Sequence, residues 1–149
     1  MPVSLTIRIP SKSFETHYSP KNVNRPDFIM INIISMDQKR TTYYDRDHFV
    51  FDVEMKLNVS LTEHTFNMNM KYEQKKLDII LTKQLGWELN ALIQKVQKQK
   101  LDPFGFGDYA RAFQYQQWKK IENQWPTTFS KATVKVTPTV RIMDHGIIE

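Results

Sequence analysis

The chain has 149 residues, enough for one domain with a sizeable core, and its 40% hydrophobic and 25% charged composition is that of a soluble globular protein rather than a disordered one. It contains no cysteine, which excludes disulfide bonds, thiolate metal sites and thiol catalysis and leaves the redox compartment undecided. The net charge is +5, and seven lysines against three acidic residues at positions 71–100 could form a basic surface, although a solvated helix face is the simpler interpretation.

The N-terminal part of the chain predicts strands. Residues 3–9 alternate between apolar and polar, which is typical of a half-buried strand, and residues 10–27 carry three prolines and are expected to form a loop. Residues 28–34 form an almost continuous apolar run, which indicates a strand covered on both faces. Residues 39–44 are expected to continue this strand outwards and to end in a turn at 45–47.

The clearest period of two begins at Phe49. Apolar residues occupy every second position up to Leu61, and polar residues stand between them. The pattern predicts a strand of thirteen residues with one buried face and one wet face. Such a strand favours an antiparallel sheet.

From about Tyr72 the period becomes helical, and the helix is expected to end near Lys100, before Asp102 and Pro103. Gly86 lies inside it and costs about 1 kcal/mol relative to alanine, which the large apolar stripe can offset. The residues expected to face the core are Leu77, Leu81, Leu85, Leu89, Leu92 and Val96, flanked by Ile80 and Ile93.

A glycine loop (residues 102–107) and a second helical segment follow. Gly105 and Gly107 permit tight backbone geometry, and Asp108 is placed to cap the next helix. That helix is expected to break around Gln114 and to end at Pro126. Its core-facing residues are predicted to be Tyr109, Phe113, Trp118, Ile121 and Trp125.

Residues 133–142 alternate again and predict a last strand, in which Pro138 falls on the inward side and indicates a bulge or an edge position. Its inward residues are Val134, Val136, Val140 and Ile142. Together the elements predict a single α+β domain over residues 1–149. We expect a mainly antiparallel sheet of about four or five strands, with a mixed sheet as the alternative, and one long helix and a shorter helical pair on one face.

No residues form a recognisable catalytic or metal-binding pattern. The pair Gly105 and Gly107 lacks the spacing of a phosphate-binding loop, and we interpret it as a turn in which Phe104 and Phe106 fill the core. The histidines are scattered, and the nearest group to a ligand cluster, at 45–48, is interpreted as a turn. No serine elbow and no carboxylate pair is present, so we expect no enzyme activity, no cofactor and no metal.

Three C-terminal segments follow one another as a glycine loop, a tryptophan helix and an alternating strand. They read LDPFGFGDYARAF, WKKIENQWPTTF and VKVTPTVRIMDHGII. Two earlier segments, INIISMDQKRT and FVFDVEMKLNVSLTEH, read as paired strands with an acidic residue at Glu63. From Ile31 onwards this order resembles the C-terminal domain of the Ger(x)C family, the C subunits of spore germinant receptors.

The family usually has a proline near the position of Tyr115, and its members begin with a signal peptide and a lipobox cysteine, which are not found in this sequence. We therefore expect the C-terminal domain of a longer lipoprotein. The resemblance implies a lipid anchor at the outer face of the spore inner membrane, integral-membrane A and B subunits as partners, and a role in nutrient-triggered germination. It implies no catalytic residues, and the residues that match as fold-defining are Gly105, Phe106, Gly107, Trp118, Trp125 and Gly146.

The resulting hypothesis is a non-enzymatic subunit domain that acts through protein–protein interaction, with membrane-surface contact as a second mode. The candidate surfaces are the aromatic segment 104–125 and the basic helix face Lys75, Lys76, Lys83 and Lys95. The alternative is a small basic nucleic-acid-binding module, which would stack bases on exposed aromatic rings. The rings recur at core-facing spacings, so we expect no nucleic-acid partner.

Overall fold

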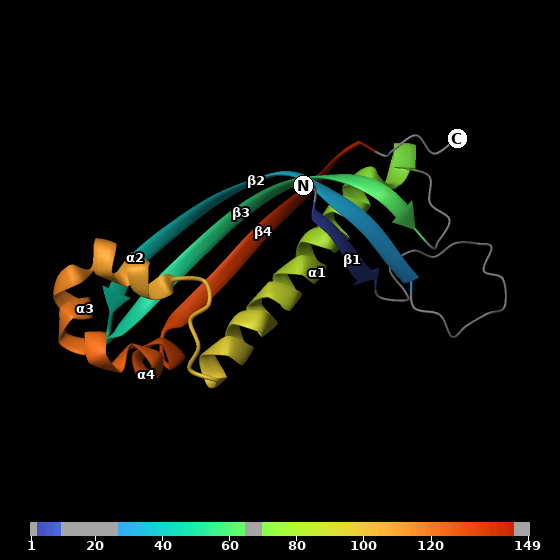
Figure 1. Cartoon of the computed structure of the whole chain (residues 1–149). Helices are drawn as coiled ribbons and strands as arrows, with labels where there is room; N and C mark the ends of the chain where they lie inside the picture. Colours follow the sequence, from blue (N-terminus) through green and yellow to red (C-terminus); the bar gives the residue numbers. More distant parts are fainter. Residues whose placement is uncertain (1–2, 10–26, 65–69, 145–149) are drawn as a thin grey trace. The chain divides into compact units, whose positions relative to one another are not determined.

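The computed structural model describes residues 3–9, 27–64 and 70–144 (Figure 1). In these ranges four strands form one sheet in the order β1-β2-β3-β4, and the chain has the predicted α+β architecture. Apart from its last residue, the loop predicted over 10–27 lies outside the described residues. The elements are β1 (Val3–Ile9), β2 (Asp27–Asp45), β3 (His48–His64), α1 (Met70–Lys98), α2 (Phe106–Phe113), α3 (Tyr115–Ile121), the 3-10 turn η1 (Glu122–Gln124), α4 (Trp125–Ser130) and β4 (Thr133–Asp144).

The chain divides into two compact units, and each is described by itself. The first unit takes its described residues from 1–37, 56–86 and 138–149. The second unit consists of 38–55 and 87–137. Strands β2, β3 and β4 and helix α1 contribute residues to both units.

In the first unit β1 pairs antiparallel with β2, and Val3 lies opposite Ile33 while Ile9 lies opposite Asp27. Alternate strand residues and one stripe of α1 are buried, because a sheet face and a helix stripe cover each other. The buried residues are Ile7, Ile9, Ile29, Ile31, Leu57, Val59, Leu61, Leu77, Leu81, Leu85, Val140 and Ile142.

The other face of the sheet is open in this unit. Phe28 is 36% exposed and Ile34 is 58% exposed, so the prediction that residues 28–34 are covered on both faces was wrong. The apolar run suggested a central strand of a two-sided sheet, but the helices within the described ranges cover one face alone. The alternation of β3, with polar residues such as Thr62 exposed, confirms the predicted wet face.

The core of the second unit is rich in aromatic rings. Phe49 and Phe51 on β3, Phe106 on α2 and Phe129 on α4 are each at most 2% exposed. The rings of Phe106 and Phe129 stack with centroids 5.5 Å apart, and Trp125 stands edge-on to Phe49 at 5.5 Å. Aromatic pairs of this kind contribute about 0.5–1.5 kcal/mol each beyond the burial of their area.

Strand directions make the sheet mixed. Arg46 and Asp47 have φ values of 48° and 66° and form the two-residue turn of an antiparallel hairpin between β2 and β3, as predicted. Strands β3 and β4 both run from residues of the second unit into residues of the first, so these neighbours are parallel. Helix α1 lies between them in sequence and makes the crossover that parallel strands need (Figure 1).

Helix α1 ends close to the predicted boundary. The N–H of Leu101 donates to the carbonyl of Val96 at 2.9 Å, and the N–H of Lys100 donates to that of Gln97 at 3.0 Å. Lys100 has a φ of 56°, so these bonds form a Schellman motif with a lysine at the left-handed position where glycine is usual.

The buried stripe of α1 differs from the prediction at Leu92. This side chain is 42% exposed, whereas Ile93 is 5% exposed. Residues four apart drift by about 40° around a helix of 3.6 residues per turn. From Leu85 the buried face follows residues four apart, Leu89 and then Ile93, so it turns gradually around the helix axis. Leu92 lies on the side that this turn leaves exposed.

Polar side chains of α1 bind the edge strand β4 in the first unit. The N–H of Ile142 donates to Oδ1 of Asp78 at 3.0 Å, and Nε2 of Gln74 donates to the carbonyl of Ile142 at 2.8 Å. The N–H of Val140 donates to Oγ1 of Thr82 at 2.9 Å. These bonds satisfy backbone groups that an edge strand would otherwise present for pairing with another chain.

Polar side chains of α1 also bind backbone groups of and before β4 in the second unit. Asn90 binds both backbone groups of Val136, accepting from its N–H at 3.0 Å and donating to its carbonyl at 2.9 Å. Nε2 of Gln97 donates to the carbonyls of Ala132 and Phe129 at 2.7 and 2.9 Å. Four helix residues advance about 6 Å and two strand residues about 6.6 Å, so a polar residue on every turn meets every second strand residue.

Pro138 has the edge position that its sequence predicted, since β4 is the last strand in the sheet order. It has no N–H to satisfy, and the α1 residue facing it is Gly86, which has no side chain to offer. A Cβ atom on Gly86 would lie 3.6 Å from Cδ of Pro138, which is ordinary van der Waals contact. At this step of the row neither residue has a side-chain donor or acceptor, and the helix and the strand approach each other closely.

The segment expected to be a helical pair forms α2, α3, η1 and α4. The predicted break at Gln114 is confirmed, since this residue separates α2 from α3. The prediction that Pro126 ends the helix was wrong, because Pro126 lies in the first turn of α4. A proline is tolerated there because first-turn N–H groups have no partner within the helix.

Candidate functional site: the glycine loop and its aromatic helices

The carboxylate of Asp102 organises the glycine loop. Its Oδ1 accepts the N–H of Phe106 at 2.9 Å, and its Oδ2 accepts the N–H of Gly107 at 2.7 Å and the indole N–H of Trp125 at 2.9 Å. The two amides belong to the first turn of α2, whose N–H groups lack intrahelical partners. Asp102 therefore caps α2, and the prediction that Asp108 does so was wrong: Asp108 is exposed within the first turn.

The two glycines of the loop are required for different reasons. Gly105 has a φ of 73°, in the left-handed region where other residues are strained. A Cβ atom on Gly107 would lie 2.9 Å from Nε1 of Trp125, closer than real Cβ contacts. The predicted tight geometry is confirmed at both positions. At Gly107 the cause is the indole of Trp125, which leaves no room for a side chain.

The phenylalanines around the loop behave differently from one another. Phe106 is 2% exposed and fills the core as predicted, but Phe104 is 40% exposed. Phe113 was expected in the core and is 62% exposed. Phe113 lies seven residues after Phe106 and so on the same side of α2, but it is the last residue of the helix and stacks on Tyr109 instead of entering the core.

The two tryptophans of the family pattern are partly buried and pack against the core of the second unit. Trp125 starts α4 and is bonded to Asp102, whereas Trp118 on α3 lies under the guanidinium of Arg111, 5.6 Å from its ring centroid. The ring of Tyr115, itself 54% exposed, lies 6.3 Å from that of Trp118. Gly146 lies outside the described residues.

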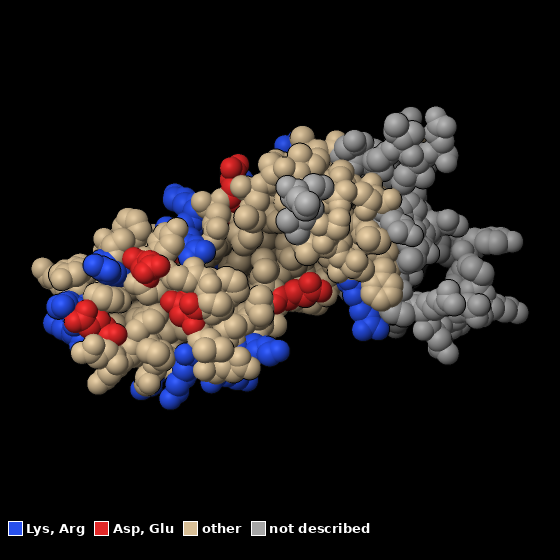
Figure 2. Space-filling model, in the orientation of Figure 1, with Lys and Arg blue, Asp and Glu red and all other residues tan. Residues whose placement is uncertain are grey.

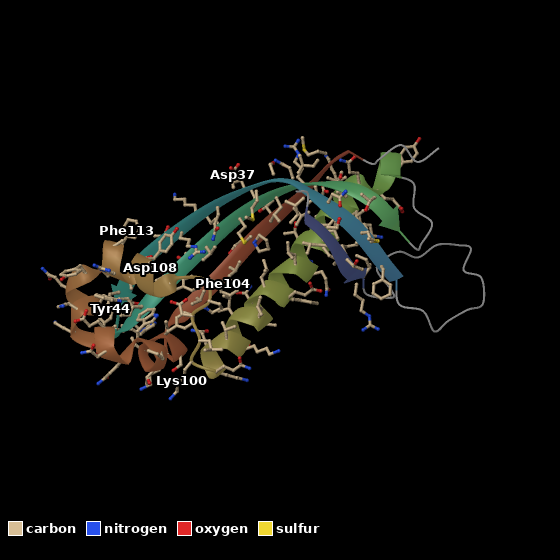
Figure 3. The ribbon with its side chains drawn as sticks, in the orientation of Figure 1. Asp37, Tyr44, Lys100, Phe104, Asp108 and Phe113 are labelled. Carbon is tan, nitrogen blue, oxygen red and sulfur yellow. The ribbon has the colours of Figure 1, made fainter. Side chains whose placement is uncertain are left out.

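Arg40 reaches the glycine loop from β2. Its Nη1 donates to the carbonyl of Phe104 at 2.8 Å, and its guanidinium carbon lies 5.0 Å from the ring centroid of Phe106 and 4.7 Å from that of Tyr109. Tyr109 stacks in turn on Phe113 at 6.0 Å. Figure 3 shows Phe104 before the start of α2 and Phe113 at its end.

The lysines of the predicted basic face are all exposed. Lys75, Lys76 and Lys83 belong to the first unit and Lys95 to the second. Lys76 and Lys83 are seven residues apart and so lie on the same side of α1. On the face drawn in Figure 2, Lys and Arg side chains are interspersed with Asp and Glu. A binding role of these lysines stays a prediction.

Among the residues that the structure describes, Lys119 and Tyr43 have shifted pKa values. A hydrogen bond from Lys119 to Glu122, together with the charge of Glu122, raises the pKa of Lys119, and the two side chains lie 2.9 Å apart. Tyr43 is 40% exposed, and desolvation of the part of its side chain that is covered raises its pKa; the charge of Asp52, which accepts the Tyr43 hydroxyl at 3.4 Å, raises it further.

The described ranges contain no group of three or more histidine, aspartate or glutamate residues that could hold a metal ion. Nδ1 of His48 lies 3.4 Å from the carbonyl of Arg46, within the predicted turn. Of the helices described, none is long and apolar enough to span a bilayer.

The sequence interpretation missed Asp102 and Arg40. Asp102 meets Trp125 across 23 positions and Arg40 meets Phe104 across 64, so no local spacing could reveal either contact. The one available signal was an aspartate directly before Pro103 and a helix start, which is a common capping arrangement.

Fold and site together define an α+β domain with a four-stranded mixed sheet and a glycine loop held by an aspartate and a tryptophan. The family model described as "Spore germination B3/ GerAC like, C-terminal" matches residues 4–146, and the chain belongs to this family. This confirms the resemblance to the Ger(x)C C-terminal domain.

The crystal structure of the GerBC protein has the same fold. It matches with a TM-score of 0.72 and 20% sequence identity, over 96% of this chain and 41% of the GerBC chain. The chain therefore spans about two fifths of the length of that protein. The comparison with curated proteins finds no match.

Proposed function

We propose that the chain is the C-terminal domain of the C subunit of a spore germinant receptor, and that it acts by binding a partner rather than by catalysis. The family match over residues 4–146 is the observation that carries this proposal. The share of GerBC that the chain covers supports its being one part of a longer protein. That protein would carry a lipid anchor at the outer face of the spore inner membrane.

The structural roles of the loop residues support a binding function. Asp102, Gly105, Gly107 and Trp125 are occupied with each other and with the backbone, which leaves them no free group for chemistry. Exposed aromatic residues lie around them, namely Phe104, Phe113 and Tyr115. Tyrosine, tryptophan and arginine dominate the binding energy of many protein interfaces, so this surface suits a partner protein.

The test is a pull-down with the tagged full chain against detergent-solubilised spore inner membrane. We expect recovery of the integral-membrane A or B subunits. A matched control is Lys135→Gln, an exposed residue on the open face of the sheet, which should capture as the native chain does. A folded chain that recovers neither subunit, in detergents that keep the A and B subunits associated, would contradict the proposal.

Membrane-surface contact is a second mode, favoured by the shared orientation of Lys76 and Lys83. Each lysine near an anionic bilayer contributes about 1 kcal/mol, and salt weakens the attraction. The double substitution Lys76→Glu, Lys83→Glu should abolish sedimentation with phosphatidylglycerol vesicles, while Lys39→Glu, Lys135→Glu, which changes the net charge equally at two exposed strand positions, serves as the charge-matched control. Unchanged sedimentation would exclude this mode.

A nucleic-acid-binding module stays the alternative. It would show binding to single strands that falls steeply with salt, because phosphate contacts release counterions. The partial burial of Trp118 and Trp125 in the core speaks against a stacking platform. Fluorescence anisotropy with a labelled oligonucleotide at two salt concentrations decides between the nucleic-acid-binding and the partner-binding function.

A further inference from the structure

Arg40 is held in a fixed orientation by aromatic rings and neutral acceptors. Its guanidinium carbon lies 5.0 Å from the ring centroid of Phe106 and 4.7 Å from that of Tyr109, and the carbonyl of Phe104 accepts from Nη1. With the amide of Gln38 turned so that its oxygen faces the guanidinium, that oxygen accepts from Nε at 2.8 Å and from Nη2 at 3.2 Å. These contacts hold the guanidinium in place, and its Nε and Nη2 groups, which face the exposed Gln38, form the edge that a planar carboxylate would take.

No carboxylate neutralises this arginine within the part of the chain that the structure describes. The acidic residue in the adjoining helix turn, Asp108, forms no ion pair with Arg40. A partly buried guanidinium with neutral partners is an incomplete arrangement, because carboxylates are the acceptors that match its paired N–H groups. Gln38 is exposed, so an incoming carboxylate can replace its oxygen without disturbing the core.

Exposed apolar rings flank the arginine. Phe104 is 40% exposed and meets Phe106 edge-on at 6.4 Å, and Phe113 is 62% exposed and stacks on Tyr109. The resulting strip (Phe104, Arg40, Tyr109 and Phe113) has an apolar ring at each end and a cation in the middle. It lies wholly within the second unit.

We propose that this strip docks a segment of a partner protein in which an aspartate or glutamate stands between apolar side chains. The carboxylate would bind Arg40, and the apolar neighbours would cover Phe104 and Phe113. A protein segment fits better than a bilayer, because lipid surfaces are recognised by clusters of several basic residues and the strip has one. The inference rests on the proposed function, since it names the surface through which such a domain would bind.

The test uses the full chain and two synthetic peptides, acetyl-Leu-Asp-Leu-amide and its asparagine counterpart. In an NMR titration we expect the aspartate peptide to shift the Nε–H signal of Arg40 and the amide of Tyr109, with at least about fivefold weaker binding of the asparagine peptide. Arg40→Gln should remove the binding. Lys39→Gln is the matched control, because Lys39 is the exposed neighbour on the opposite face of β2.

Since Arg40→Gln also removes a bond to Phe104, its fold is checked by thermal unfolding, and Phe113→Ala provides a variant at an exposed position. We expect Phe113→Ala to weaken the aspartate peptide about threefold without lowering the melting temperature. Equal affinity for both peptides, or binding that survives Arg40→Gln, would overturn the proposal. Phosphatidylglycerol vesicles that shift the Arg40 signal when the peptides do not would identify a lipid surface instead.

The pull-down separates this inference from the function on which it rests. Capture of receptor subunits by the native chain but not by folded Arg40→Gln supports both. Equal capture by the two chains would leave the proposed function standing and overturn the strip as its surface. Peptide binding without any capture would support the strip and count against the receptor partners.

Discussion

Trp125 donates its indole N–H to Oδ2 of Asp102 at 2.9 Å, and this bond ties the first residue of α4 to the loop before α2. The same oxygen accepts the N–H of Gly107 at 2.7 Å. Because one oxygen serves both donors, the position of the indole and the start of α2 are set together. Two helices that are separate in sequence thus share one hydrogen-bonding centre.

Replacing Asp102 is expected to be strongly destabilising. Asp102→Ala would leave three partly buried donors, on Phe106, Gly107 and Trp125, without an acceptor. A lost hydrogen bond to a charged group costs about 1.5–3 kcal/mol, and water can replace part of it, so we expect a loss of about 2–4 kcal/mol. The free energy of unfolding, determined by urea titration of both chains, measures this loss.

Asp102→Asn keeps one oxygen and should lose about half as much stability. The control is Asp108→Ala, at an exposed position in the same helix turn, which should cost less than about 1 kcal/mol. Equal losses in the free energy of unfolding for Asp102→Ala and Asp108→Ala would show that the hydrogen bonds to Asp102 stabilise the fold no more than an exposed aspartate does.

Two glycine-to-alanine substitutions should have opposite effects. At Gly107 the new Cβ would lie 2.9 Å from Nε1 of Trp125, which forces the indole to move and should cost about 1–3 kcal/mol. At Gly86 the Cβ would make ordinary contact with Pro138 at 3.6 Å, and alanine is the better helix former by about 1 kcal/mol. Thermal unfolding of the pair should show a lowered melting temperature for the first and a raised one for the second. A raised melting temperature for Gly107→Ala would contradict the close approach of the indole.

Local periodicity was sufficient for the main elements. The period of two from Phe49 to Leu61 predicted β3, and the change of period near Tyr72 predicted α1, because both patterns arise from the burial of one face. The turn at Arg46 and Asp47 followed from polar residues between two strands. These features depend on neighbours a few positions apart.

The errors arise where a distant partner decides the outcome. Leu92 fits the apolar stripe by its spacing, but its exposure depends on which side of α1 meets the sheet. The polar row of α1 contains Asn90, whose partner Val136 lies 46 positions away, so its role at the strand edge is invisible in the sequence of the helix. Pro126 illustrates a third kind of error, since a proline starts a helix as readily as it ends one.

The same substitution at two threonines should have different effects on stability. Oγ1 of Thr82 accepts the N–H of Val140 at 2.9 Å, so Thr82→Val would leave a strand-edge amide without a partner and should cost about 1–3 kcal/mol. Thr42 is 8% exposed, and its Oγ1 has no hydrogen-bond partner in the part of the chain that the structure describes. Thr42→Val should therefore be neutral or stabilise by up to about 1 kcal/mol. Urea unfolding of both variants measures the difference, and a large loss from Thr42→Val would reveal a bound water at that hydroxyl.

Tyr43 is expected to ionise at a higher pH than a free tyrosine. Burial disfavours its phenolate, and the charge of Asp52, whose Oδ2 accepts its hydroxyl at 3.4 Å, disfavours it further, so the pKa of Tyr43 lies above its ordinary value near 10. The folded state holds this proton more tightly than the unfolded state. The stabilising effect is therefore complete below pH 10 and is lost as the pH rises through the raised pKa.

The absorbance difference at 295 nm between the native chain and Tyr43→Phe follows this single phenol through an alkaline titration. Asp52→Asn should lower the midpoint because it removes the neighbouring charge but keeps the burial, which remains the larger cause of the raised pKa. Glu54→Gln, at an exposed position two residues further along β3, removes the same charge and should leave the midpoint in place. An unchanged midpoint in Asp52→Asn would mean that burial alone holds the proton, whereas an equal fall in both variants would assign the effect to the net charge of the open sheet face.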